Sequence, residues 1–237
     1  MDSRGVAQPG RVLAWGARGR RFDSCHPDHK NNHKMRKAIL YLHGKGGSAN
    51  EAEFYKPFFP SCDVIGVDYR DSTPWKAAED IISAYRWVAK QYNGVSVVAN
   101  SIGAYFGMLA LGGVNIEHAY FISPVVDLEH LILDLMAWSN VNEQELLEKK
   151  IIVTQNWTEP LSWEYLKYVR EHPITWRVST DILYGEKDVL IPFETITKFV
   201  KHSDANITVM KGGEHWFHTN EQVKFHDAWL KRCVVEK

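Results

Sequence analysis

Three residues with clear chemical meaning, Ser101, Asp188 and His215, each lie shortly after a short apolar run. A serine hydroxyl is a poor nucleophile until a base takes its proton, and histidine is a common base for this purpose. The histidine in turn needs a carboxylate that fixes its tautomer and stabilises the imidazolium. This set of residue types therefore predicts attack of an activated serine on a carbonyl carbon.

Ser101 lies within the segment Ala99-Asn100-Ser101-Ile102-Gly103, between an apolar run at 95–99 and a small-residue run at 104–111. This pattern is typical of a nucleophile elbow, a sharp strand-to-helix turn written G-x-S-x-G in its common form, with alanine here at the first position. Such a turn presents the hydroxyl at a helix N-terminus, where free N–H groups favour a developing negative charge. We expect Ser101 to be the nucleophile, against the alternative that it only caps the helix.

A glycine-rich loop, His43-Gly44-Lys45-Gly46-Gly47, follows the first apolar run. A loop at this place can bring a second backbone N–H to a tetrahedral intermediate. We expect an oxyanion hole made by the N–H groups of Lys45 and Ile102. His43 is expected to pack under the loop, and the Lys45 side chain to be solvated.

The acid and the base each have rivals nearby in the sequence. Asp188 competes with Glu186 in the same loop and with Asp127, and is favoured by its place after Gly185. His215 is preferred to His218 because it follows two glycines just past the last strand-like run. The spacing of these two histidines admits a metal ion, but no third ligand is evident, so we expect neither a metal nor an organic cofactor.

Strand-like and helix-like segments alternate from residue 35 onward, which predicts an α/β fold with a parallel sheet. The expected strands are 38–42, 63–69, 95–99, 118–123, 181–184 and 206–210. The expected helices of the main domain are 74–92, 104–111, one that starts at Pro192 and one capped by Thr219 with Gln222. The segment 124–178 is too long for a plain connection, and we expect a helical cap there with helices at about 127–138, 142–150 and 161–171.

Residues 1–34 differ from the rest of the chain, with five Arg and two Lys against three Asp and no amphipathic period. The string from Gly5 to His26 resembles the conceptual translation of a transfer-RNA gene, and Met35 opens an alternative start. We expect 1–34 to be disordered and functionally silent, and 35–237 to form the domain. The rival reading of this segment is a basic arm that binds nucleic acid.

The composition of the 237 residues is that of a globular chain, 45% hydrophobic and 24% charged with a formal net charge of −1. That balance gives no general attraction to nucleic acid or to an anionic membrane, so we expect neither as a partner. Cys25, Cys62 and Cys233 are too few and too dispersed for a disulfide framework or a paired-cysteine zinc site. Reduced thiols are typical of a cytoplasmic protein, which is the expected location.

With these motifs in place, residues 35–237 resemble the α/β-hydrolase family, because Ser101, Asp188 and His215 follow the family's chain order. The resemblance implies a doubly wound, mostly parallel sheet of about six strands, with a cap inserted after the fourth. It also implies that Ser101 is the nucleophile, His215 the base and Asp188 its orienting partner. The family's usual opening pair of strands is missing from 35–237, which leaves edge protection and oligomeric state open.

The leading functional hypothesis is a serine hydrolase that cleaves a small carboxylic ester or a related acyl substrate through an acyl-enzyme. An amidase, a peptidase or an acyltransferase would use the same triad. A non-catalytic protein that binds a small ligand under its cap is the alternative from another class, since fold does not determine function.

Overall fold

The structure is a computed structural model that describes residues 36–69, 73–155 and 159–235. Its centre is a six-stranded sheet in the order β2-β1-β3-β4-β7-β8, in which every neighbouring pair is parallel. The strands are β1 (Lys37–Leu42), β2 (Cys62–Gly66), β3 (Gly94–Asn100), β4 (Ala119–Ile122), β7 (Thr180–Gly185) and β8 (Ala205–Met210). Each expected strand is present, and the parallel arrangement places all six carboxyl ends along one edge of the sheet.

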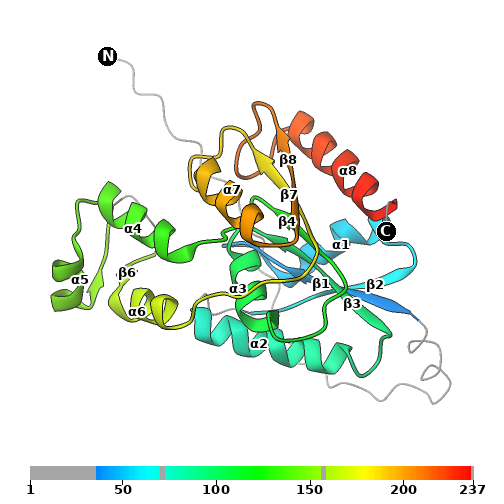
Figure 1. The fold of residues 1–237 in the computed structure, drawn as a ribbon, viewed down its shortest axis with the longest axis horizontal. Helices are drawn as coiled ribbons and strands as arrows, with labels where there is room; N and C mark the ends of the chain where they lie inside the picture. The colour runs from blue at the N-terminus through cyan, green and yellow to red at the C-terminus, as the bar shows by residue number, and fades with distance from the viewer. Residues whose placement is uncertain (1–35, 70–72, 156–158, 236–237) are drawn as a thin grey trace, which may run out of the picture.

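Helices cover both faces of the sheet (Figure 1). The larger core joins the sheet to α2 (Pro74–Val88), α3 (Ile102–Leu111) and α7 (Phe193–His202). The smaller core joins it to α8 (Asn220–Val235) and to the short helices α1 (Ala52–Tyr55) and η4 (Lys56–Phe58), which directly follow η3 (Ala49–Glu51). This doubly wound arrangement agrees with the expected fold class.

Alternation along β1 explains why the strand is apolar throughout. Ala38, Leu40 and Leu42 enter the larger core, whereas Ile39 and Tyr41 enter the smaller one. Successive side chains of a strand point to opposite faces, so a strand covered by helices on both sides must be apolar at nearly every position.

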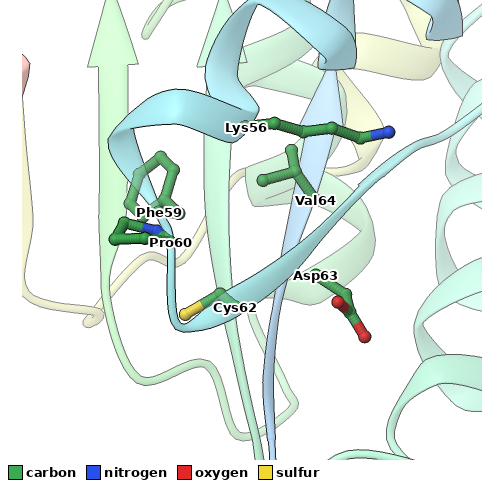
Figure 2. Close-up of a pocket in the computed structure, with 6 residues that line it drawn as sticks. All are labelled: Lys56, Phe59, Pro60, Cys62, Asp63 and Val64. Carbon is green, nitrogen blue, oxygen red and sulfur yellow. The ribbon is translucent and has the colours of Figure 1, made fainter.

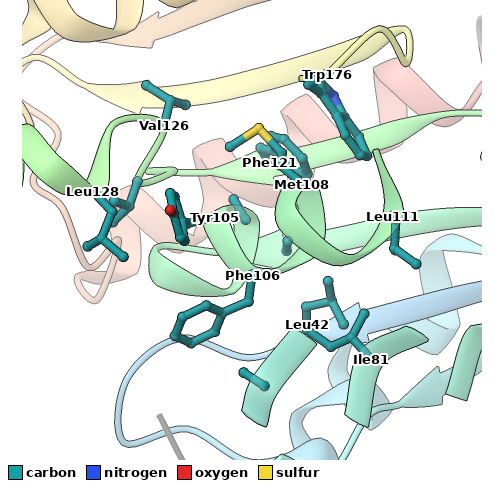
Figure 3. Close-up of a cluster of buried hydrophobic side chains, with 14 of the residues drawn as sticks. Leu42, Ile81, Tyr105, Phe106, Met108, Leu111, Phe121, Val126, Leu128 and Trp176 are labelled. Carbon is teal, nitrogen blue, oxygen red and sulfur yellow. The ribbon is translucent and has the colours of Figure 1, made fainter. Parts of the chain in front are cut away.

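Helix α3 lies at the centre of the larger core, as Figure 3 shows for its residues Tyr105, Phe106, Met108 and Leu111. Phe106 and Met108 are almost fully buried in this core, and α3 as a whole contacts both α2 and the sheet. Burial of each large apolar side chain contributes about 1.5–3 kcal/mol. The helix that begins directly after Ser101 is therefore firmly held.

Several details differ from the sequence-based expectation, among them the end of α2 at Val88 instead of at residue 92. The strand expected at 63–69 ends at Gly66, because the chain then turns so that Tyr69 is buried and donates a hydrogen bond to the carbonyl oxygen of His43. The short helices between Ala49 and Phe58 were not expected, since each spans only one turn and has no readable period.

The described part of the segment between β4 and β7 holds three helices and a two-stranded antiparallel ladder. These elements are α4 (Leu128–Trp138), α5 (Glu143–Lys149), β5 (Ile151–Ile152), β6 (Leu161–Ser162) and α6 (Trp163–Glu171). They lie on the left in Figure 1, to one side of the sheet. Caps explain where the helices begin, because Asp127, Asn142 and Ser162 each accept a hydrogen bond from a backbone N–H of the first turn.

Among residues 36–69, 73–155 and 159–235, the helices are all too short or too polar to cross a membrane. A pocket of about 470 Å³ lies at the amino end of β2, lined by Lys56, Phe59, Pro60, Cys62, Asp63 and Val64 (Figure 2). Its two charged groups are already paired, Lys56 with Glu53 at 2.5 Å and Asp63 with Arg36 at 2.7 Å. This pocket is at the end of the strands opposite to the candidate chemistry.

His226 on α8 is buried among the rings of Phe54, Tyr55, Phe58 and Trp229, at centroid separations of 5.7–6.3 Å. Burial lowers the pKa of His226 below its ordinary value of 6.5, against the opposing effect of Asp227. Between this lowered pKa and 6.5 the unfolded chain binds the proton more readily than the folded one, so stability rises with pH in that window.

We therefore expect His226→Phe to reduce the loss of unfolding free energy on acidification from about pH 7.5 to about pH 5.5. Urea titrations at the two pH values measure the difference. His202→Phe, at an exposed histidine on α7, is the control and should leave the pH dependence as it is. Identical pH dependence in His226→Phe and the unchanged protein would contradict the prediction.

Candidate active site

Ser101 lies in a strained turn between β3 and α3. Its φ of 49° and ψ of −119° lie outside the regions that L-residues favour. Backbone bonds hold the turn, because the Ser101 N–H donates to the Ile122 carbonyl at 2.9 Å and Val125 N–H donates to the Ser101 carbonyl at 3.0 Å. Strain of this kind costs about 1–3 kcal/mol and persists only where the surroundings enforce it.

Gly103 lets α3 start against the end of β1. A Cβ added at Gly103 would lie 2.5 Å from the carbonyl oxygen of His43 and 2.6 Å from that of Leu42. Both obstacles are backbone atoms, which cannot move aside as a flexible side chain can. The small residue two positions after Ser101 is thus required by the close approach of helix and strand.

We expect Gly103→Ala to lower the free energy of unfolding by about 1–3 kcal/mol, because the new methyl group must displace backbone. Urea denaturation measures the change. Gly113→Ala is the matched control, since a Cβ there would meet nothing within 4 Å. Equal stability of the two variants would show that the elbow is looser than described.

The three expected side chains meet at the carboxyl edge of the sheet. Ser101 Oγ lies 2.9 Å from His215 Nε2, and His215 Nδ1 lies 2.7 Å from Asp188 Oδ2. Both the His215 and the Asp188 side chains are buried, at 3% and 0% exposure. The imidazole therefore bridges a hydroxyl and a carboxylate that are 87 positions apart in the chain.

The surroundings of Asp188 determine which imidazole nitrogen carries the proton. Asp188 Oδ1 accepts the backbone N–H groups of Leu190 at 2.9 Å and Ile191 at 3.0 Å. When the other oxygen, Oδ2, accepts as well, its donor is His215 Nδ1–H. Nε2 is then the free acceptor that faces the Ser101 hydroxyl, as a general base requires.

The loops that carry the acid and the base are joined by backbone contacts. Lys187 N–H donates to the Gly213 carbonyl at 2.7 Å, and Gly212 N–H donates to Glu186 Oε2 at 2.8 Å. A Cβ at Gly185 would lie 2.7 Å from the backbone of Gly213. The two glycines thus allow the ends of β7 and β8 to bring Asp188 beside His215.

The rival residues have other partners. Glu186 accepts the N–H of Gly212, and Asp127 caps α4 through the N–H of His130 at 3.0 Å. His218 is exposed and pairs with Glu214 at 3.4 Å. Neither ring nitrogen of His215 is free for a metal ion, because Ser101 and Asp188 occupy both.

The glycine-rich loop passes directly beside the nucleophile. A Cβ at Gly44 would lie 3.5 Å from Ser101 Cβ. Gly47 N–H donates to the Gly44 carbonyl at 3.1 Å, and Gly46 has a φ of 73°, so residues 44–47 form a turn of the kind that needs glycine at its third position. The N–H of Lys45, the second residue, is not used within such a turn.

The second expected donor is the N–H of Ile102, the first residue of α3. N–H groups in the first turn of a helix have no intrahelical acceptor. The ring of His43 is stacked on the ring of Tyr69 with a centroid separation of 4.0 Å, as expected for a residue that packs under the loop. The Lys45 side chain, expected to be solvated, is exposed, and its Nζ lies 3.6 Å from Glu159 Oε1.

Solved structures share this architecture along most of the chain. Est1E from Butyrivibrio proteoclasticus superposes with a TM-score of 0.69 at 15% identity, over 88% of this chain and 90% of its own. The chain has the α/β-hydrolase fold. The α/β hydrolase domain-containing protein 10 from mouse matches this α/β-hydrolase fold with a TM-score of 0.69 at 16% identity, covering 84% of this chain and 90% of its own.

A third protein with the α/β-hydrolase fold, the esterase Pf2001 of Pyrococcus furiosus, has a TM-score of 0.59 at 16% identity, over 84% of this chain and 81% of its own. No protein-family model and no curated protein sequence matches the chain. At these identities the likeness establishes the fold, and the chemistry must be argued from the site.

Sequence reasoning missed the polar side chains behind the elbow. Glu51 accepts a hydrogen bond from the Tyr41 hydroxyl, which in turn accepts one from Asn100. The only local signal was the pattern Ser48-x-x-Glu51, typical of a capping box, which the structure contains. Nothing in the sequence indicated that Tyr41 would face Asn100.

Proposed function

We propose that this protein is a serine hydrolase that cleaves small carboxylic esters through an acyl-enzyme. The observation that carries the proposal is the bridge from Ser101 Oγ through His215 to Asp188, at 2.9 Å and 2.7 Å. Ser101 is the nucleophile, His215 the general base and then the general acid, and Asp188 the residue that orients the imidazole. The fold shared with the esterase Pf2001 supports this reading.

In the acylation step, Ser101 Oγ attacks the ester carbonyl carbon while its proton passes to His215 Nε2. The carbonyl oxygen becomes an oxyanion, which the N–H groups of Lys45 and Ile102 stabilise. The C–O bond to the alcohol then breaks, and the proton on Nε2 passes to the leaving oxygen. The alcohol departs and the acyl group remains on Ser101.

In the deacylation step, His215 takes a proton from water as the water oxygen attacks the acyl carbon. Collapse of the second tetrahedral intermediate returns the proton to Ser101 Oγ and releases the acid. Every proton transfer passes through His215 Nε2, so the Asp188 carboxylate keeps its charge throughout. The cycle balances without a metal ion or an organic cofactor.

In this proposal, the elements α4 to α6 form a cap over the site. Lys45 in the glycine-rich loop pairs with Glu159, from the loop between β5 and β6. The rings of Tyr165 and Tyr168 on α6 also pack against the ring of Trp75 on α2, with centroid separations of 6.1 Å and 5.3 Å. These contacts support placing part of the segment 124–178 beside the oxyanion hole.

A fluorophosphonate probe tests the proposal, because its phosphorus is attacked by an activated serine with loss of fluoride. We expect one adduct, on Ser101, identified by mass spectrometry of the digested protein. Ester turnover is measured in parallel on p-nitrophenyl esters of increasing chain length. Absence of both the adduct and turnover would overturn the proposal.

The panel also separates the alternative reactions that share the triad. Matched aminoacyl amides test for amidase activity, and added alcohols or amines test for acyl transfer, by ratios of kcat/KM. A ferulate ester belongs in the panel because Est1E has been solved with ferulic acid bound. Stoichiometric binding of a panel member without turnover would favour a non-catalytic ligand-binding protein.

A further inference from the structure

A row of hydrogen-bonded side chains lies behind the nucleophile elbow, on the face of the sheet opposite α3. The Tyr41 hydroxyl on β1 donates to Glu51 Oε2 at 2.5 Å, and it accepts from Asn100 Nδ2 at 2.8 Å. Asn100 is the residue directly before Ser101, and its Oδ1 accepts from the Tyr55 hydroxyl at 3.2 Å. The row therefore connects the elbow to η3, which follows the glycine-rich loop.

Glu51 also holds the end of that loop. Its Oε1 accepts the backbone N–H of Ser48 at 3.1 Å. A Cβ at Gly47 would lie 2.7 Å from the same oxygen, so the loop backbone passes in contact with the carboxylate. The other end of the loop is held at His43, whose carbonyl accepts from the Tyr69 hydroxyl. Lys45 lies between these two attachments.

The Tyr41 hydroxyl can donate one hydrogen bond and accept another because it stays protonated. The residue has no exposed surface, and burial, with the nearby Tyr55 and Glu51, raises the pKa of Tyr41 far above its ordinary value. One proton is available and it goes to Glu51, which leaves the oxygen lone pair for the N–H of Asn100. The direction of each bond is thereby determined, and a phenylalanine would break both.

We propose that Tyr41 and Glu51 are positioning residues for ester hydrolysis. They fix the position of the Lys45 N–H relative to the Ile102 N–H, so that both can donate to the oxyanion. This inference rests on the proposed function. Neither side chain contacts the Ser101 hydroxyl or His215 in any hydrogen bond of the described residues. They act through the loop on one side and through Asn100 on the other.

The two oxyanion donors come from separate segments of the chain, so their relative position depends on contacts between those segments. Productive geometry must be held within about 0.5 Å, and a 1 Å misplacement costs about a hundredfold in rate. The oxyanion exists in the transition state and not in the bound ester, so the loss falls on kcat and spares KM.

The test compares Tyr41→Phe, Glu51→Gln and the double variant in p-nitrophenyl ester hydrolysis. Each single change should lower kcat about tenfold to a hundredfold with KM within about twofold. The double variant should be no slower than the slower single variant, because both changes break the same connection. Affinity for a trifluoromethyl ketone, which forms a tetrahedral oxyanion on serine, should fall by the same factor as kcat.

Glu51 is exposed and glutamine has nearly the same shape, so Glu51→Gln carries the test even if Tyr41→Phe does not fold. Glutamine has one acceptor oxygen where Glu51 uses two, so either Ser48 or Tyr41 loses its acceptor. The matched control is Tyr85→Phe on α2, which removes a hydrogen bond from the phenol to the Asn115 carbonyl and should leave kcat unchanged.

Two results would overturn the inference alone: an active protein in which Glu51→Gln keeps kcat within about twofold, or losses that add in the double variant. An unchanged protein that neither turns over esters nor labels at Ser101 would overturn the proposed function, and this inference with it. That failure is visible before any variant is made, so the two are distinguishable.

Discussion

Ser101→Ala is expected to lower kcat/KM for ester hydrolysis by about 10⁵- to 10⁶-fold, the largest effect of any single change in this chain. The change removes the atom that attacks the carbonyl carbon, and no other described hydroxyl is hydrogen-bonded to His215. Turnover of a p-nitrophenyl ester measures the loss, and labelling by the fluorophosphonate probe should disappear with it.

The same change should leave the fold intact, because the Ser101 hydroxyl makes no helix-capping hydrogen bond. The left-handed φ of 49° strains serine and alanine alike, so the unfolding free energy should stay within about 1 kcal/mol. Ser203→Ala, which removes a hydroxyl bonded to the Phe199 carbonyl on α7, is the activity control. A Ser101→Ala protein with more than about a tenth of the original rate would remove Ser101 from the mechanism.

Asp188→Asn is expected to lower kcat by about 10⁴-fold while the site keeps its shape. The oxygen of the new amide will stay with the N–H groups of Leu190 and Ile191, because only an acceptor suits that side. Its NH2 group must then face His215 Nδ1, which becomes an acceptor. Nε2 consequently carries the proton and cannot take another from Ser101.

Glu186→Gln is the matched control for that prediction, since it exchanges a carboxylate for an amide in the same loop. The glutamine oxygen can still accept from Gly212 N–H, so activity should stay within about threefold of the original. A larger loss in Glu186→Gln than in Asp188→Asn would mean that the wrong carboxylate has been assigned to the triad.

The strands were predictable because burial on both faces requires nearly continuous apolar residues, as in β1 with Ile39 and Tyr41 on one side and Leu40 and Leu42 on the other. Helix starts were predictable for a similar local reason. Thr219, for example, accepts from Gln222 N–H at 3.3 Å at the start of α8. Errors arose where contacts distant in sequence decide, as at Tyr69, which leaves the expected strand to reach His43.

The expectations for residues 1–34 and for Cys25 lie outside the described residues and stay predictions. Cys62 and Cys233 form no disulfide with each other or with any other described residue. Burial raises the pKa of the Cys62 thiol, although the cations Lys37 and Arg36 act in the opposite direction. A protonated thiol at that place has no evident part in the proposed reaction.

The sequence by itself determined the order of strands and helices, the elbow around Ser101 and the glycines that close approach demands, because these depend on burial, capping and backbone sterics over a few residues. Only the tertiary structure showed that Asp188, and not Glu186, contacts His215, and that His215, and not His218, contacts Ser101. It also joined Glu51 to Asn100 through Tyr41. Such contacts depend on which side chains come within about 3 Å of each other in the folded protein. The number of residues between two side chains in the sequence does not indicate how close they lie.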